Sequence, residues 1–104
     1  LVDNHHIIPK QFQLHPLIQQ LNIDLACSKN IVFLPNRYAK DIYYNDSIIY
    51  HDSHPKYNKY IKKELDFIHS IKDKNEKSYQ FILFFMYLQQ CLEQNNNYIR
   101  SLFS

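Results

Sequence analysis

Histidine, a residue type that can bind metal ions and transfer protons, is concentrated in two short parts of the chain. Two of the six histidines are adjacent, His5 and His6, and two more lie close together near the middle, His51 and His54. Imidazole is the commonest transition-metal ligand and the one side chain whose unperturbed titration falls near neutral pH. The two clusters flank a strand-like stretch, so we expect one assembled site. The chemistry that this site favours is metal-assisted hydrolysis.

The spacing within each cluster predicts how its members are used. Neighbouring residues of a strand point to opposite sides, so His5 and His6 are not equivalent ligands of one ion and should have different roles. Residues four apart on a helix share a face, so His54 and Asn58 can approach a common point. His51, just before that helix, is able to reach the same point.

Length and composition indicate one globular domain. The chain has 104 residues, of which 45% are hydrophobic, and this is enough for one modest core. The formal charge of +2 permits a polyanionic partner without requiring one. Cys27 and Cys91 are too isolated for a Cys-x-x-Cys metal site or a disulfide framework. The start lacks a signal-peptide pattern, as expected for a domain cut from a longer protein, and no apolar run reaches the roughly 20 residues that span a bilayer.

The spacing of apolar and turn-forming residues predicts a helix-rich α+β fold. The expected elements are a strand over 4–9, a helix over 12–21, a strand over 30–35, a tyrosine-rich loop over 36–52 with a brief extended piece at 48–50, a helix from 53 or 54 to 71, a charged break over 72–77 and a long helix over 78–103. Because glycine is absent, asparagine and aspartate should supply the left-handed turn positions, at Asn22, Asn36 and Asn45-Asp46. His15, before Pro16, is expected to cap or pack against the first helix. The last helix is apolar on almost every side, which favours burial against several neighbours over a surface for a partner chain.

Several short motifs occur in an order that resembles the AHH family of the HNH nuclease superfamily. They are Asn4-His5-His6-Ile7-Ile8-Pro9-Lys10, His15-Pro16, Ile23-Asp24, Asn30-Ile31-Val32-Phe33-Leu34-Pro35 and His51-Asp52-Ser53-His54-Pro55-Lys56-Tyr57-Asn58. The resemblance spans about residues 3 to 65, and its specificity lies in the order of the motifs. Asn4 stands where the family name has an alanine. Domains of this family commonly form the C-terminal part of bacterial polymorphic toxins.

The resemblance implies a ββα-metal core, in which a two-stranded hairpin and a helix hold one divalent ion. To this core the present chain adds an N-terminal helix and a long C-terminal helix. Residues 1–104 would then be a single nuclease domain, with the core region over 1–71 and a helical extension over 72–104. The implied activity is that of a DNA endonuclease toxin, with RNA as the alternative substrate. Such a toxin is secreted or delivered into the cytoplasm of a target cell and is neutralised in the producer by a cognate immunity protein.

The resemblance also implies roles for individual residues. The general base that activates water is His6, and Asn30 matches the middle asparagine of the HNH name, which ties the hairpin loop and so holds His6. The implied metal ligands come from the strand and the helix: His5, His54 and Asn58. Such ligands suit zinc, magnesium, manganese or nickel. The spacing before the helix is one residue shorter than the usual family form, which leaves His51 as a third ligand, a phosphate contact or part of the turn.

Basic residues beside the motifs favour a phosphate-bearing substrate. Those expected to contact it are Lys10, Arg37 and Lys56. Exposed tyrosines are able to stack on bases, although tyrosines of a small core are the more ordinary explanation. One alternative is a non-catalytic zinc-stabilised module that binds nucleic acid, and another is an interaction domain with incidental histidines. No cysteine lies near the histidines, which argues against a closed structural zinc site.

Overall fold

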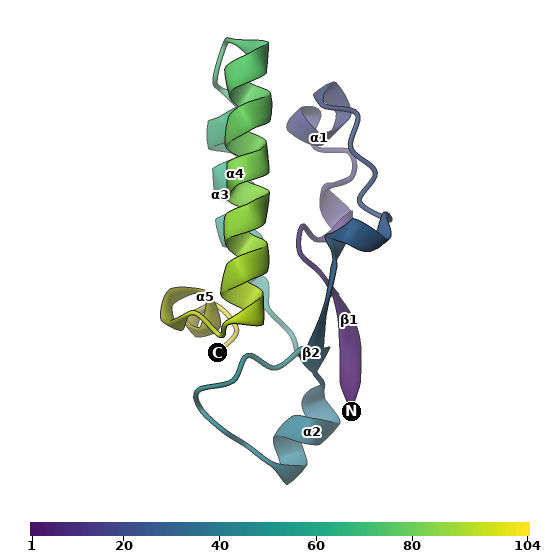
Figure 1. Ribbon diagram of the computed structural model, residues 1–104, viewed down its shortest axis with the longest axis vertical. Helices are drawn as coiled ribbons and strands as arrows, with labels where there is room; N and C mark the ends of the chain where they lie inside the picture. The colour runs from purple at the N-terminus through teal and green to yellow at the C-terminus, as the bar shows by residue number, and fades with distance from the viewer.

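The computed structural model describes residues 1–104, and it is an α+β fold with a two-stranded antiparallel sheet (Figure 1). The elements are β1 (Val2–His6), α1 (Pro16–Gln20), β2 (Ile31–Pro35), α2 (Arg37–Ile42), α3 (Pro55–His69), α4 (Lys74–Glu93) and α5 (Asn97–Ser101), with 3₁₀ turns at Lys10–Phe12 and Ser28–Asn30. His5 pairs with Val32, and His6 pairs with Ile31. The predicted fold class is therefore confirmed, although the two strands are joined by a long segment that contains α1 and not by a tight turn.

The core lies between α3, the sheet and α4. The buried side chains of α3 are Tyr57, Ile61, Leu65 and Ile68, whose spacing places them on one face of the helix. They belong to one cluster of 19 buried residues that runs from Ile7 to Phe103. Helices α3 and α4 lie side by side, as Figure 1 shows, and α4 also contacts β2. None of the helices combines the length and the apolar character that a membrane crossing requires.

Helix α3 begins where the sequence predicts. Its N-cap is His54, and Pro55 occupies the first turn, where a missing N–H leaves no hydrogen bond unmade. The first helix is shorter than the predicted range of 12–21, because α1 starts only at Pro16 and a 3₁₀ turn precedes it. Proline is compatible with the first turn of an α-helix but not with its interior, so the helix cannot extend back through Pro16.

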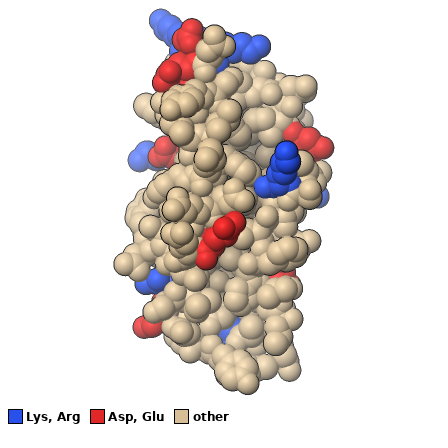
Figure 2. Space-filling model, in the orientation of Figure 1, with Lys and Arg blue, Asp and Glu red and all other residues tan.

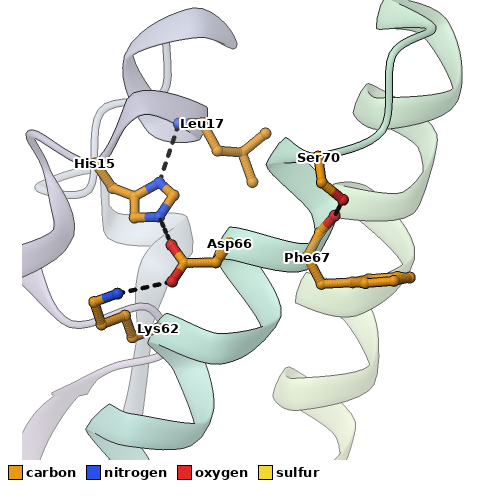
Figure 3. Close-up of polar contacts among 6 residues, drawn as sticks. All are labelled: His15, Leu17, Lys62, Asp66, Phe67 and Ser70. Carbon is orange, nitrogen blue, oxygen red and sulfur yellow. Dashed lines mark hydrogen bonds and ion pairs between the residues drawn. The ribbon is translucent and has the colours of Figure 1, made fainter.

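His15 has the structural role that the sequence indicates (Figure 3). Its Nδ1 accepts a hydrogen bond from the backbone N–H of Leu17 at 3.0 Å and caps α1. Its Nε2 lies 2.7 Å from the carboxylate of Asp66 on α3, which also accepts a hydrogen bond from Lys62. The hydrogen bond from Lys62, and then that from His15, lowers the pKa of Asp66. This contact joins the segment after β1 to α3.

The prediction of a continuous loop over 36–52 is wrong. Residues Arg37–Ile42 form α2, because the side chain of Asn36 accepts a hydrogen bond from the N–H of Ala39 at 3.0 Å. The asparagine expected to make a turn therefore caps a helix. No strand forms at 48–50; the extended pairing falls at His51, which makes an isolated bridge with Asn36.

The prediction of one helix over 78–103 is also wrong, because α4 and α5 are separate. Asn95 between them has a φ of 53°, a left-handed conformation that ends α4. The start lies earlier than predicted, since the side chain of Asp73 accepts a hydrogen bond from the N–H of Glu76 at 2.8 Å. Much of the expected charged break is thus the first turn of α4. Asn22, with a φ of 56°, does provide the left-handed turn expected there.

Helix α4 is buried on only one side. Its buried apolar residues are Phe81, Leu88, Cys91 and Leu92, whereas Tyr79, Ile82, Leu83, Met86 and Tyr87 are exposed. Figure 2 shows a face on which charged side chains are sparse along the middle of the molecule and gather near one end. The expectation that all-round apolarity means burial against several neighbours therefore holds for one face of this helix alone.

Candidate active site

The strand β1 presents its two histidines differently. The side chain of His5 points into the protein and is 1% exposed, whereas His6, the next residue, is partly exposed. This difference follows from the alternation of side chains along a strand. The sequence-based expectation of two different roles thus has a structural basis.

Three imidazoles meet at one point. The ring centroid of His5 lies 5.4 Å from that of His51 and 5.1 Å from that of His54. One ring nitrogen from each of the three lies within 4.8 Å of the others. His51 is held there because its backbone N–H donates to the carbonyl of Pro35, at the end of β2, at 2.7 Å. His54 is held there as the N-cap of α3.

The environment of His5 fits a cation. Both of its ring nitrogens are buried, and neither has a hydrogen-bond partner in the protein. Buried polar atoms almost always have a hydrogen-bond partner. Two buried ring nitrogens without one, beside two further imidazoles, fit a histidine that binds a metal ion. Burial, and then the neighbouring charges of His54 and His51, lowers the pKa of His5 to about 3. The ring is therefore neutral near pH 7, as a ligand must be.

The other two imidazoles are oriented by hydrogen bonds. Nδ1 of His51 lies 3.1 Å from Oδ2 of Asp3, and Nδ1 of His54 lies 3.0 Å from Oδ1 of Asn58. Because these oxygens only accept, each Nδ1–H donates and each Nε2 keeps its lone pair. Such partners commonly fix the tautomer of metal-binding histidines. Asn58, predicted as a ligand, is brought to the site but its amide oxygen holds His54.

Asp3 is a member of the site that sequence reasoning missed. Its hydrogen bond from His51 lowers the pKa of its carboxyl group. A signal was available, because residues two apart on a strand lie on the same side, which places Asp3 beside His5. The hydrogen-bond partner of Asp3, His51, is 48 residues away in the sequence, so no local pattern indicated this contact.

Two aromatic rings pack against the imidazoles. Tyr57 lies 5.2 Å and Phe103 5.4 Å from His5, measured between ring centroids, and both rings also pack against His54. The hydroxyl of Tyr57 donates to the carbonyl of Ile7 at 2.5 Å, next to His6. No sequence signal placed Phe103 here, because it comes from the far end of the chain.

His6 lines a pocket at the edge of the imidazole cluster. A small pocket of about 120 Å³ is lined by His5, His6, Pro9, Lys10, His51 and His54. Burial, and then the charges of Lys10 and His51, lowers the pKa of His6. The neutral, proton-accepting form of His6 is therefore favoured at neutral pH. Of the three predicted substrate contacts, Lys10 alone lines this pocket, whereas Arg37 and Lys56 are exposed outside it.

Asn30 is buried and ties together the chain behind His6. Its Oδ1 accepts from the N–H of Ile8 at 2.9 Å, and its Nδ2 donates to the carbonyls of Ile8 and Leu25 at 2.8 and 3.0 Å. Its backbone carbonyl accepts from the N–H of Ile7 at 2.8 Å. Asn30 does not line the pocket and so acts as a positioning residue for the segment that follows His6.

Comparison with known proteins assigns the chain to a family. No curated protein and no solved structure matches it. Residues 2–83 match AHH, described as a nuclease family of the HNH/ENDO VII superfamily with conserved AHH. This range contains all the histidines of the cluster and most of the chain. The chain therefore belongs to the AHH family of nucleases, whose substrates are nucleic acids.

Proposed function

We propose that this chain is a metal-dependent endonuclease that hydrolyses phosphodiester bonds of DNA. The observation that carries the proposal is the imidazole cluster, in which the buried His5 has two unpaired nitrogens beside His51 and His54. We assign these three residues as the metal ligands and His6 as the general base. The sequence left three roles open for His51: a third ligand, a phosphate contact or part of the turn. In this assignment His51 is the third ligand.

Different residues of the chain have different roles in the proposed hydrolysis. His6, neutral because its pKa is lowered, accepts a proton from the attacking water at a ring nitrogen. The three ligand imidazoles offer lone pairs, and Asp3 keeps His51 in the required tautomer. A divalent ion bound there supplies positive charge for the phosphate and the leaving oxygen. A ligand set of imidazoles favours zinc or nickel over magnesium and manganese, which prefer oxygen ligands.

Basic side chains near the pocket account for substrate binding. Lys10 lines the pocket and is placed to contact the phosphate under attack. Arg37 and Lys56, exposed at the first turns of α2 and α3, contact phosphates further along the strand. Each such contact makes binding weaker as salt rises, because phosphate contacts release counterions.

We further propose that the domain is the C-terminal part of a larger toxin. It acts in the cytoplasm of a target cell and is neutralised in the producer by a cognate immunity protein. The support for this role is the family resemblance. Expression of the domain in a bacterial cytoplasm should arrest growth and fragment DNA, whereas expression of the His6→Ala variant should do neither.

The decisive experiment is plasmid nicking with a panel of divalent ions, with and without a chelator. The wild-type chain should nick only with a metal ion, and His6→Ala should bind the ion but cut about 10²- to 10⁴-fold more slowly. His5→Ala should lose both metal binding and cutting. His69→Gln, which changes a histidine outside the pocket, is the control and should cut normally.

Two results would count against the assignment. If His6→Ala cuts at the wild-type rate, His6 is not the base. If the wild-type chain binds metal and DNA but never cuts, it is a zinc-stabilised nucleic-acid-binding module instead.

A further inference from the structure

We infer that a second pocket beside the imidazole cluster binds one nucleotide of the DNA strand, with its base on Tyr44 and a phosphate between Lys40 and Arg100. This inference rests on the proposed nuclease function. The pocket has a volume of about 250 Å³ and lies where α2 and the loop after it face α5. In Figure 1 that loop passes from α2 toward the C-terminal helix. The volume is close to the lower end of the about 300–1,000 Å³ of small-molecule sites, so the pocket has room for no more than one nucleotide unit.

Tyr44 provides an aromatic surface on a fixed support. Its ring stacks on that of Tyr50, with centroids 6.2 Å apart and planes inclined by 23°. Tyr50 is itself buried, and its hydroxyl donates to the carbonyl of Tyr43 and accepts from the N–H of Asn45. Tyr44 nevertheless remains 67% exposed. A supported but exposed tyrosine is the kind of platform on which proteins stack nucleic-acid bases.

Two cations line the same pocket. The guanidinium of Arg100 is held by the carbonyl of Asn95 at 3.0 Å and by the side chain of Asn97 at 2.8 Å. Lys40 is only loosely paired, with its Nζ 4.0 Å from the carboxylate of Asp52. Two carboxylates lie close by, because Asp46 also lines the pocket and Asp52 is the partner of Lys40. Cations beside an aromatic platform match a phosphate joined to a base.

Phe103 lies between this pocket and the imidazole cluster. This residue lines the pocket, while its ring packs at 5.4 Å from His5 and at 5.4 Å from His54. A nucleotide in the pocket is thus a near neighbour of the phosphate at the histidines. Arg100 and Phe103 both lie beyond residue 83, where the family match ends. The second pocket therefore depends on residues outside the matched range.

The test is binding of a fluorescently labelled single-stranded DNA oligonucleotide to the His6→Ala protein, followed by anisotropy. Base stacking is worth about 1–3 kcal/mol, so adding Tyr44→Ala should weaken binding by about 5- to 150-fold. Tyr44→Phe keeps the ring and should restore binding. Tyr43→Ala is the matched control, because Tyr43 is the next residue, is 75% exposed and does not line the pocket. Equal losses in Tyr44→Ala and Tyr43→Ala would overturn the inference.

The charged side of the pocket gives a second test, which also serves if Tyr44→Ala does not fold. Lys40→Gln should weaken binding several-fold, whereas Lys63→Gln, which removes a charge from the exposed face of α3, should have a smaller effect. Equal effects of the two lysine variants would mean unspecific attraction and would overturn the inference.

The binding test separates this inference from the nuclease proposal. If the wild-type chain never nicks a plasmid but binding still depends on Tyr44, the pocket stands and the nuclease proposal fails. If nicking occurs and Tyr44→Ala changes neither oligonucleotide binding nor KM, the pocket assignment fails alone.

Discussion

Asn30→Asp is a sharp test of how the structure holds the site together. The substitution keeps the size of the side chain and keeps one oxygen that accepts from the N–H of Ile8. It replaces the amide nitrogen, which donates to the carbonyls of Ile8 and Leu25, by a second oxygen. Two buried attractive contacts thereby become repulsive, with almost no change in shape.

The expected loss of stability is large. Each buried acceptor left without its donor costs about 1–3 kcal/mol, and two acceptors are affected. An uncompensated buried charge costs about 3–5 kcal/mol. These terms overlap, so Asn30→Asp should lower the free energy of unfolding by about 3–5 kcal/mol at neutral pH. That is a large share of the about 5–15 kcal/mol typical of a folded domain.

Urea denaturation followed by far-ultraviolet circular dichroism measures this loss. Asn96→Asp is the matched control, because the side chain of Asn96 only accepts, from the N–H groups of Tyr98 and Ile99 at the start of α5. A carboxylate accepts equally well there and is favoured at a helix N-terminus. The control should therefore be as stable as the wild type.

The pH dependence adds a second readout. Burial raises the pKa of the introduced carboxyl in the folded state above its unfolded value, and its protonated form is able to donate again. The destabilisation should then be largest at neutral pH and shrink as the pH falls toward about 4. If Asn30→Asp is as stable as Asn96→Asp at neutral pH, the hydrogen bonds described for Asn30 do not hold the protein together.

Three further predictions concern other parts of the structure. Tyr57→Phe deletes a hydroxyl that donates to the backbone carbonyl next to His6, so it should cost about 1–3 kcal/mol in a urea titration. Tyr60→Phe, at a partly buried tyrosine of the same helix, is the control and should cost much less. Burial and the charge of Lys10 lower the pKa of His6, so Lys10→Gln should raise that pKa and move the acid limb of the pH–rate profile for nicking to higher pH; an unmoved limb would contradict the base assignment. The pKa of Asp66 is lowered by the lysine and histidine drawn in Figure 3, so its stabilisation is present above the ordinary value of 3.8 and lost as the pH falls through the lowered one. Asp66→Asn should therefore be less stable than the wild type at neutral pH and equally stable in acid, and a constant difference across pH would refute this.

Much of the fold was predictable because its signals are local. The apolar run at 31–34, which favours a strand, and the proline at the start of α3 act through neighbouring residues. The same reason explains the errors. Asn36 and Asn95 are the same residue type, but Asn36 caps the start of α2 and Asn95 ends α4. Which of these roles an asparagine takes depends on which backbone groups near it need hydrogen-bond partners.

The candidate site divides in the same way. The amino-acid sequence alone determined that four imidazoles are available in two clusters, and that His5 and His6 face different ways, because strand geometry requires it. Only the tertiary structure decided that His51 joins His5 and His54, that Asp3 orients it, and that a ring from the far end of the chain covers the cluster. These contacts join side chains that are far apart along the chain. Their distances are set by how the helices pack against the sheet, and periodicity and spacing do not record that packing.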